Sequence, residues 1–289
     1  MVKRRPKRRW VWGVFLALFC GAGLAVTLLH PFSNLMRANA MTMITHGDVY
    51  RDADGAELPY RLMVPLKVKH GETYPLVLSL HGGGCEGTDN TAQLMSVVPI
   101  FTTTAARRDF PCYVLAPQCP PGTAWVDERA ATADGYLFPA APSLPLRMAL
   151  ELVARLPDEY PIDRDRIYVV GYSRGATGGW DALIRRPDLF TAGVLLCGRG
   201  VPARAAGIAD IPVWVAHGAH DDAISADCSR KMVRALRAAG GAPRYLEYCD
   251  GGHNVGWNAL QHPDLLPWLF AQRRGDAGSF TQPAPSLER

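Results

Sequence analysis

The stretch GYSRGATGGW, residues 171–180, decides the fold of this chain. In it, Ser173 stands between two glycines at G-x-S-x-G spacing, after the apolar residues 167–170 and before a helix-compatible run over residues 175–186. A strand that turns sharply into a helix needs small residues on both sides of the turn, because the backbone there is strained and tightly packed. Such a turn exposes the serine hydroxyl at the end of a sheet and points helical N–H groups at a reacting atom. The stretch therefore predicts a nucleophilic Ser173, provided that the rest of the chain supplies its partners.

Short apolar runs and helix-like segments alternate along the chain on both sides of this stretch. The apolar runs, typical of strands buried on both faces, cover residues 75–80, 113–116, 167–170, 193–197, 213–216 and 245–248. The helix-like segments cover residues 92–107, 144–155, 175–186, 226–239 and 263–273. This alternation predicts an α/β protein with a mostly parallel central sheet and helices on both faces. Residues 47–65 have the pattern of two strands joined at Asp54-Gly55, which predicts an N-terminal antiparallel hairpin.

The N-terminus carries a targeting pattern. Six of the first nine residues are Lys or Arg, and residues 10–29 contain no charge. Twenty apolar residues span roughly the 30 Å of a bilayer core, with the basic flank on the cytoplasmic side. The length favours an uncleaved membrane anchor, whereas the A-x-A site at residues 38–40 favours a signal peptide that is cleaved after Ala40. Both interpretations predict export to the periplasm or the extracellular space.

The charge and the composition divide the chain further. The net charge of +4 comes from the basic tip, since the remainder carries 4 − 6 = −2, and a mildly acidic body does not favour nucleic-acid binding. We expect a signal peptide or membrane anchor over residues 1–30, a tether over 31–43, a catalytic domain over 44–274 and a disordered tail over 275–289.

Residues 118–145 are rich in Pro and Gly and have no clear period. In an α/β protein, so long a loop is expected over the carboxyl ends of the strands, where ligands bind.

Three glycines follow the first predicted parallel strand, in the segment His81-Gly82-Gly83-Gly84. Glycines at this place let backbone N–H groups approach a developing oxyanion without interference from side chains. The residue after the predicted nucleophile supplies a further N–H group. We therefore assign the oxyanion hole to Gly83, Gly84 and the backbone of Arg174.

An acid and a base are predicted at two later strand ends. Asp221 follows the strand at 211–216, and the neighbouring Asp222 is the alternative. His253 follows the strand at 245–248 and two glycines, and we prefer it to His262, which precedes a proline at the start of the last helix. The order of serine, aspartate and histidine is then that of α/β-hydrolases and differs from that of chymotrypsin- and subtilisin-type proteases.

Cysteines and histidines leave two further interpretations open. Six cysteines lie beyond the apolar segment, and export permits disulfides between them. Cys228 and Cys249 are a candidate pair, because a bond between them would brace the loops of the acid and of the histidine. A metal site formed by His217, His220 and Asp221 is disfavoured, because H-x-x-H-D in a loop lacks a recognised ligand geometry. We expect no metal and no other cofactor.

Over residues 74–269 the sequence resembles the secreted esterase branch of the α/β-hydrolases, in particular carboxylesterases known as predicted peptidases. These are akin to polyhydroxybutyrate-depolymerase-like and feruloyl-esterase-like enzymes. The segments that carry the resemblance are PLVLSLHGGGCEGTDN, VLAPQCPPGTAW, DRIYVVGYSRGATGGWDALIRRPDLFTAGVLLCG, IPVWVAHGAHDD and YCDGGHNVGWN. The resemblance implies an α/β-hydrolase fold, with Ser173 as nucleophile, Asp221 as acid and His253 as base. Two positions depart from the family pattern: Arg174-Gly175-Ala176 replaces Met-Gly-Gly, and Cys85 follows the HGGG segment.

Together, the residues and the resemblance predict an exported serine hydrolase that cleaves a small-molecule or polymeric carboxylic ester through an acyl-enzyme. We place His81, Trp125 and Trp257 in the substrate cleft, with the 118–145 loop as its wall. Two alternatives remain open. The same residues would serve a serine peptidase, and the fold alone would also suit a membrane-tethered binding module without activity.

Overall fold

The computed structural model describes residues 36–132 and 135–275. The expected anchor or signal peptide, residues 31–35 of the expected tether and residues 276–289 of the expected tail lie outside them. In the part of the chain that is described, no helix has the length and apolarity needed to cross a membrane. The rest of the expected tether differs from the prediction, since residues 36–42 are helical. Met41 buries its side chain in the core, which holds this helix against the domain.

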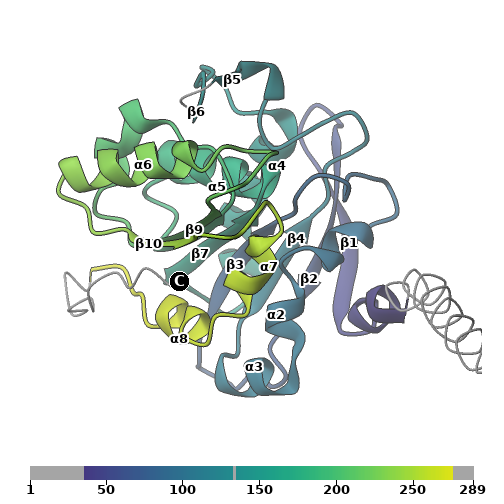
Figure 1. The fold of residues 1–289 in the computed structure, drawn as a ribbon. Helices are drawn as coiled ribbons and strands as arrows, with labels where there is room; N and C mark the ends of the chain where they lie inside the picture. Colours follow the sequence, from purple (N-terminus) through teal and green to yellow (C-terminus); the bar gives the residue numbers. More distant parts are fainter. Residues whose placement is uncertain (1–35, 133–134, 276–289) are drawn as a thin grey trace, which may run out of the picture.

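An eight-stranded sheet forms the centre of the molecule, in the order β1-β2-β4-β3-β7-β8-β9-β10 (Figure 1). Its strands are β1 (Thr45–Arg51), β2 (Glu57–Met63), β3 (Tyr74–Leu80), β4 (Tyr113–Pro117), β7 (Ile162–Tyr172), β8 (Ala192–Leu196), β9 (Val213–Gly218) and β10 (Arg244–Tyr248). Strand β2 is antiparallel to both of its neighbours, and all the other neighbours are parallel. The predicted hairpin and the mostly parallel sheet are therefore confirmed.

Helices cover both faces of the sheet, as the continuous apolar strands predict (Figure 1). They are α2 (Pro99–Thr102), α3 (Thr104–Asp109), α4 (Leu144–Glu159), α5 (Arg174–Arg185), α6 (Asp227–Ala238), α7 (Val255–Leu260) and α8 (Leu265–Phe270). Successive side chains of a strand point to opposite faces. Leu76 and Leu78 of β3 accordingly pack with α4, α5 and α6, whereas Val77 joins the core with α2, α7 and α8.

The segment 92–107 differs from the single helix that we predicted. It forms a 3₁₀ turn, η1 (Ala92–Met95), and then the two short helices α2 and α3. Pro99 begins α2, where a missing N–H costs nothing, but a proline could not lie inside one continuous helix without removing a hydrogen bond. Thr103 is extended and its side chain accepts a hydrogen bond from the N–H of Ala106, so it begins a new helix.

The 118–145 loop is fixed by polar contacts of Tyr136 and of its backbone with the domain. It contains η2 (Glu128–Ala130) and the two-residue strands β5 (Ala131–Thr132) and β6 (Gly135–Tyr136), which pair with each other. The Tyr136 hydroxyl donates to Asp181 Oδ2 at 2.5 Å, and Arg185 pairs with the same carboxylate. Arg185 also donates to the carbonyl of Pro139 at 2.8 Å. These contacts fasten the loop to α5, the helix that follows the predicted nucleophile.

Strand register brings the predicted site residues to one edge of the sheet. Leu80, the last residue of β3, lies opposite Gly171 in β7, so the HGGG segment and the serine turn leave the sheet side by side. Tyr248 of β10 lies opposite Gly218 of β9, so the acid and histidine loops also start together. Carboxyl ends of parallel strands are where α/β proteins bind ligands.

Candidate functional site

Ser173 occupies a strained turn between β7 and α5. Its φ of 58° and ψ of −119° are unusual for a residue with a side chain, and its N–H donates to the carbonyl of Leu196 at 2.8 Å. A Cβ on Gly171 would lie 2.2 Å from the oxygen of Gly175. A Cβ on Gly175 would lie 2.0 Å from the oxygen of Leu80. Both glycines are therefore required by packing around the serine.

The imidazole of His253 bridges the serine and the aspartate. Its Nε2 lies 2.8 Å from Ser173 Oγ, and its Nδ1 lies 2.7 Å from Asp221 Oδ2. Because a carboxylate only accepts, Nδ1 carries the hydrogen and Nε2 accepts from the serine hydroxyl. The structure thus brings the three predicted residues together. The alternative base, His262, instead packs edge-on against Trp214, with 5.1 Å between the ring centroids.

The Asp221 carboxylate is fully buried and has donors on both oxygens. Its Oδ1 accepts from the N–H groups of Ala223 at 2.9 Å and Ile224 at 2.8 Å, and its Oδ2 faces His253. The alternative acid, Asp222, is exposed. The loop after β9 therefore orients the carboxylate through its own backbone.

A second histidine, His217, lies behind the acid. It is buried, and its Nε2 lies 2.9 Å from the carbonyl oxygen of Ile224 and 3.1 Å from Asp221 Oδ2. Since Nε2 faces two acceptors, it carries the hydrogen, and the hydroxyl of Ser229 donates to Nδ1 at 2.7 Å. Burial lowers the pKa of His217, which favours this neutral form. This contact with the acid was not predicted, since His217 was weighed only as a metal ligand, and spacing along a strand end and a loop does not indicate it.

Among the described residues, Cys197, His217 and Asp221 have potential ligand atoms within 4.8 Å of one another, and His220 is not part of this group. The carboxylate oxygens already accept from His253 and from two backbone N–H groups. A metal ion here would have to displace these bonds, so the donor set does not fit one.

All six cysteines of the described residues are free thiols, so the disulfide predicted between Cys228 and Cys249 is wrong. Cys228 is buried in α6, whereas Cys249 is exposed after the end of β10. The polar contacts of His217 with Ser229 of α6 brace the acid loop instead.

The N–H groups of the glycine segment have different partners. Gly82 donates to Ser96 Oγ at 3.2 Å, and Gly84 donates to Glu86 Oε2 at 2.8 Å. Within residues 36–132 and 135–275, no acceptor faces the N–H of Gly83, which is exposed. The assignment of Gly84 to an oxyanion hole is therefore wrong, because the Glu86 carboxylate already occupies its N–H group.

The glycine segment lies directly against the serine turn. A Cβ on Gly82 would lie 3.5 Å from the Cβ of Ser173. Arg174 is the first residue of α5, so its backbone N–H belongs to the helix N-terminus beside the serine. The N–H groups of Gly83 and Arg174 are thus the two candidate donors to an oxyanion.

His81 is not a cleft residue, which corrects the prediction. Its side chain is buried, its Nδ1 donates to the carbonyl of Gly82 at 2.8 Å, and its Nε2 accepts from the N–H of Cys119 at 3.0 Å. Burial lowers the pKa of His81 and favours this neutral tautomer. The carbonyl of Gly82 and the N–H of Gly83 belong to one peptide plane, so His81 orients the candidate donor.

Of the two predicted cleft tryptophans, only Trp257 is accessible. Trp125 is 1% exposed and donates from Nε1 to the carbonyl of His81 at 3.0 Å, so it holds the first residue of the HGGG segment. Trp257 is 39% exposed, and its ring centroid lies 6.3 Å from that of Tyr172. Tyr172 in turn donates to the carbonyl of His253 at 2.9 Å. Trp257 therefore lies on the histidine side of the site.

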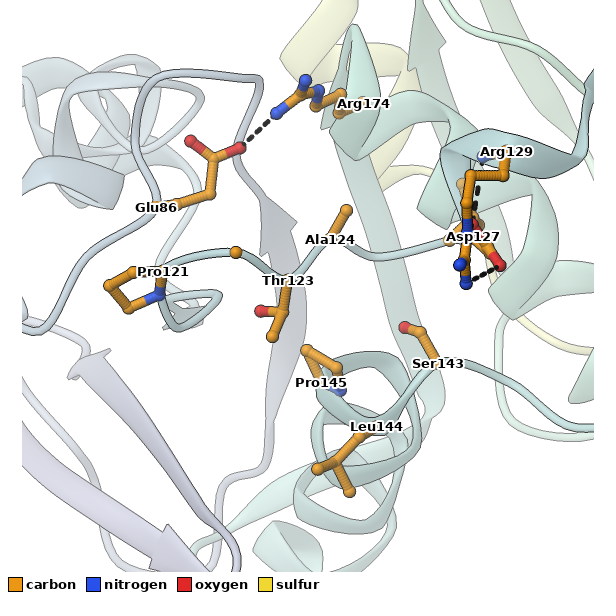
Figure 2. A pocket seen from close by; sticks show the side chains of 12 residues that line it. Glu86, Pro121, Thr123, Ala124, Asp127, Arg129, Ser143, Leu144, Pro145 and Arg174 are labelled. Carbon is orange, nitrogen blue, oxygen red and sulfur yellow. Dashed lines mark hydrogen bonds and ion pairs between the residues drawn. The ribbon is translucent and has the colours of Figure 1, made fainter.

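A pocket of about 850 Å³ opens beside Arg174 (Figure 2). Its lining residues are Glu86, Pro121, Gly122, Thr123, Ala124, Val126, Asp127, Arg129, Ser143, Leu144, Pro145 and Arg174. The charged groups of the lining form two ion pairs, Arg174 with Glu86 at 2.7 Å and Arg129 with Asp127 at 2.8 Å. The pocket therefore combines small apolar walls with internally paired charges. All of its lining residues except Glu86 and Arg174 belong to the 118–145 loop, and none of the aromatic side chains of this loop is among them.

Neither a protein-family model nor a curated protein matches the sequence. Among solved structures, a thermostable esterase superposes with a TM-score of 0.74 at 36% identity, over 80% of this chain and 64% of the esterase. A ferulic acid esterase gives a TM-score of 0.59 at 17% identity, over 78% of this chain and 97% of that one. A putative dipeptidyl aminopeptidase IV from Bacteroides ovatus ATCC 8483 gives 0.54 at 18% identity, over 78% of this chain and 34% of that one.

These similarities differ in weight. The ferulic acid esterase and the aminopeptidase share only the fold with this chain, since their identities are below 20%. The thermostable esterase is similar in sequence as well, although this chain spans only 64% of its length. The strand order, the serine turn and this similarity show that the chain has an α/β-hydrolase fold.

Proposed function

We propose that this chain is a serine hydrolase that cleaves carboxylic esters through an acyl-enzyme. The observation that carries the proposal is the position of His253, whose Nε2 lies 2.8 Å from Ser173 Oγ while its Nδ1 lies 2.7 Å from Asp221. A histidine held between a hydroxyl and a buried carboxylate removes the hydroxyl proton as the oxygen attacks.

The reaction follows from these contacts in two halves. Ser173 Oγ attacks the ester carbonyl carbon while its proton moves to His253 Nε2, and the oxyanion that forms accepts from the N–H groups of Gly83 and Arg174. The tetrahedral intermediate collapses, His253 returns the proton to the leaving alkoxide, and an acyl-serine remains. Water then attacks the acyl carbon with His253 as base, and the serine leaves with the proton. Asp221 keeps the hydrogen of His253 on Nδ1 and stabilises the imidazolium.

Esters are favoured over peptides as substrates. The similar structure with 36% identity is an esterase, whereas the aminopeptidase shares only the fold. We place the bulkier part of the substrate in the 850 Å³ pocket beside Arg174 (Figure 2). Its paired charges and its Thr123 and Ser143 side chains suit a polar or aromatic group better than a long alkyl chain. We also propose export of the enzyme, on the basic tip and the apolar residues 10–29.

Hydrolysis of p-nitrophenyl esters from acetate to octanoate tests the proposal, with the full chain and its Ser173→Ala variant. We expect the variant to lose at least about 10⁴-fold in kcat. Ser225→Ala is the matched control, because Ser225 is exposed. Activity that survives Ser173→Ala would refute the assignment of the nucleophile. If the wild-type chain cleaves peptides but no ester, it is a peptidase, and if it cleaves neither, it is a binding module.

A further inference from the structure

The side chain of Arg174 crosses the glycine segment. A Cβ on Gly83 would lie 3.3 Å from both Cδ and Nε of Arg174, so the arginine occupies the space that a side chain at position 83 would need. Its Nη1 donates to Glu86 Oε1 at 2.7 Å (Figure 2). The arginine that replaces the family's methionine after the nucleophile is therefore in contact with the segment that carries the oxyanion donor.

Glu86 joins this arginine to the backbone of the segment. Its Oε2 accepts from the N–H of Gly84 at 2.8 Å, while Oε1 accepts from Arg174. The side chain of Glu86 is only 18% exposed. Burial alone would raise the pKa of Glu86, but hydrogen bonds from its own N–H, from Arg174 and from Gly84 outweigh it and lower the pKa. Charge-assisted bonds of this kind are shorter and stronger than neutral ones.

The two sides of Gly83 are thus held by different contacts. Ser96 and His81 fix the preceding residue, Gly82, through its N–H and its carbonyl. Gly84, which follows, has a φ of 82° and is fixed by Glu86. Three consecutive glycines have more backbone freedom than any other tripeptide, so a precise N–H position at Gly83 requires such contacts.

We propose that Arg174 and Glu86 form a clamp that positions the N–H of Gly83 relative to the N–H of Arg174, and that Arg174 is therefore a positioning residue through its side chain. The inference rests on the proposed function, because it assigns these N–H groups to the oxyanion. The clamp ties the glycine segment to the first residue of α5, so the ion pair between Arg174 and Glu86 links the two donors. The clamp itself does not bind the substrate in the rest of the pocket, where other residues make the contacts.

Three variants of the full chain test the clamp. Arg174→Met restores the family residue and removes the ion pair, Glu86→Gln keeps the shape and removes the charge, and the double variant combines both changes. Arg186→Met is the matched control, since Arg186 follows the same helix, is 37% exposed against 41% for Arg174, and pairs with Asp188 at 2.8 Å. The readouts are kcat and KM for p-nitrophenyl acetate, Ki for an alkyl trifluoromethyl ketone, whose adduct with serine carries an oxyanion, and the rate of labelling by a fluorophosphonate.

We expect each single variant to lose roughly tenfold in kcat, in affinity for the ketone and in labelling rate, with KM within about threefold of wild type. This is part of the ~10²–10³ that a whole oxyanion donor supplies. The double variant should be no worse than the poorer single variant, because both residues act as one unit, and Arg186→Met should match wild type. Wild-type kcat, Ki and labelling in Arg174→Met and Glu86→Gln would overturn the clamp alone, as would losses confined to KM. A wild-type chain that neither hydrolyses esters nor reacts with the fluorophosphonate would overturn the proposed function and the clamp together.

Discussion

Asp221→Asn is a sharp test of the site, because the backbone forces the orientation of the new amide. Oδ1 of Asp221 accepts from the N–H groups of Ala223 and Ile224 at 2.9 and 2.8 Å. In the variant, the carbonyl oxygen must take this place, since an amide nitrogen there would face two donors. The amide nitrogen then replaces Oδ2 and points at Nδ1 of His253.

The consequence is the wrong tautomer of the histidine. An amide nitrogen donates, so His253 accepts at Nδ1 and carries its hydrogen on Nε2, which faces Ser173 Oγ at 2.8 Å. In this form it cannot take the serine proton. A change of this kind costs ~10⁴-fold in kcat, or about 5.5 kcal/mol in the activation free energy. The variant loses the contact of His217 Nε2 with Oδ2 at 3.1 Å but keeps the bond of His217 to the carbonyl of Ile224 and both backbone bonds to Oδ1, so the melting temperature should change little.

The assay is hydrolysis of p-nitrophenyl acetate at pH 8 by wild type, Asp221→Asn and Asp222→Asn. Asp222 is the matched control because it is the adjacent carboxylate and is exposed. We expect Asp222→Asn to match wild type. If Asp221→Asn keeps its activity within tenfold of wild type, Asp221 does not orient the base. The two backbone N–H groups that hold its Oδ1 would then have no role in catalysis.

Three further predictions concern the surroundings of the site. His217→Gln should lower kcat roughly tenfold at constant KM, because the acid loses a buried neighbour 3.1 Å away, and unchanged kinetics would contradict this role. Burial lowers the pKa of His81 and His217 below 6.5 in the folded chain, so their contribution to stability is present above pH 6.5 and is lost as the pH falls through the folded values. The melting temperature should therefore be lower at pH 5 than at pH 7, and the difference between the two should be smaller in His217→Gln than in wild type. A wild-type melting temperature at pH 5 that equals or exceeds the value at pH 7 would disprove this prediction. Gly175→Ala should cost at least about 3 kcal/mol in urea unfolding, since its Cβ would lie 2.0 Å from the carbonyl oxygen of Leu80, whereas Gly207→Ala, which meets nothing within 4 Å, should cost under about 1 kcal/mol.

The strands and the three bridged side chains could be predicted because their signals are local. Buried parallel strands appear as continuous apolar runs, and the residues just after them must gather at one edge of the sheet. Ser173 is marked by its small neighbours, and the structure shows that Gly171 and Gly175 have no room for a side chain. The segment 92–107 was harder, since Pro99 and Thr103 divide an apolar pattern that would suit one helix.

The errors concern which polar groups meet in three dimensions. Gly83 and Gly84 look alike in the sequence, and only the return of Glu86 to the N–H of Gly84 distinguishes them. His81 and Trp125 are residue types common in clefts, yet both side chains are buried here. The indole of Trp125 donates to the carbonyl of His81, and the imidazole of His81 is held between the carbonyl of Gly82 and the N–H of Cys119. Spacing along the chain does not determine such contacts, because they depend on the path of loops between strands.

The glycine segment shows why a motif is not sufficient for an active site. Glycines give the backbone the freedom to bring an N–H close to a reacting atom, but the same freedom would blur its position. This chain removes the freedom with side chains outside the motif: Ser96 and Glu86 each take one N–H, and His81 orients the peptide between them. Among the described residues, no acceptor is present for the middle N–H, that of Gly83. A chain with the same HGGG segment but without these partners would keep the donors and lose their geometry, and since a donor stabilises the transition state only from a fixed position, it would lose most of the rate advantage as well. The residues to compare among α/β-hydrolases are therefore the partners of the glycines as much as the glycines themselves.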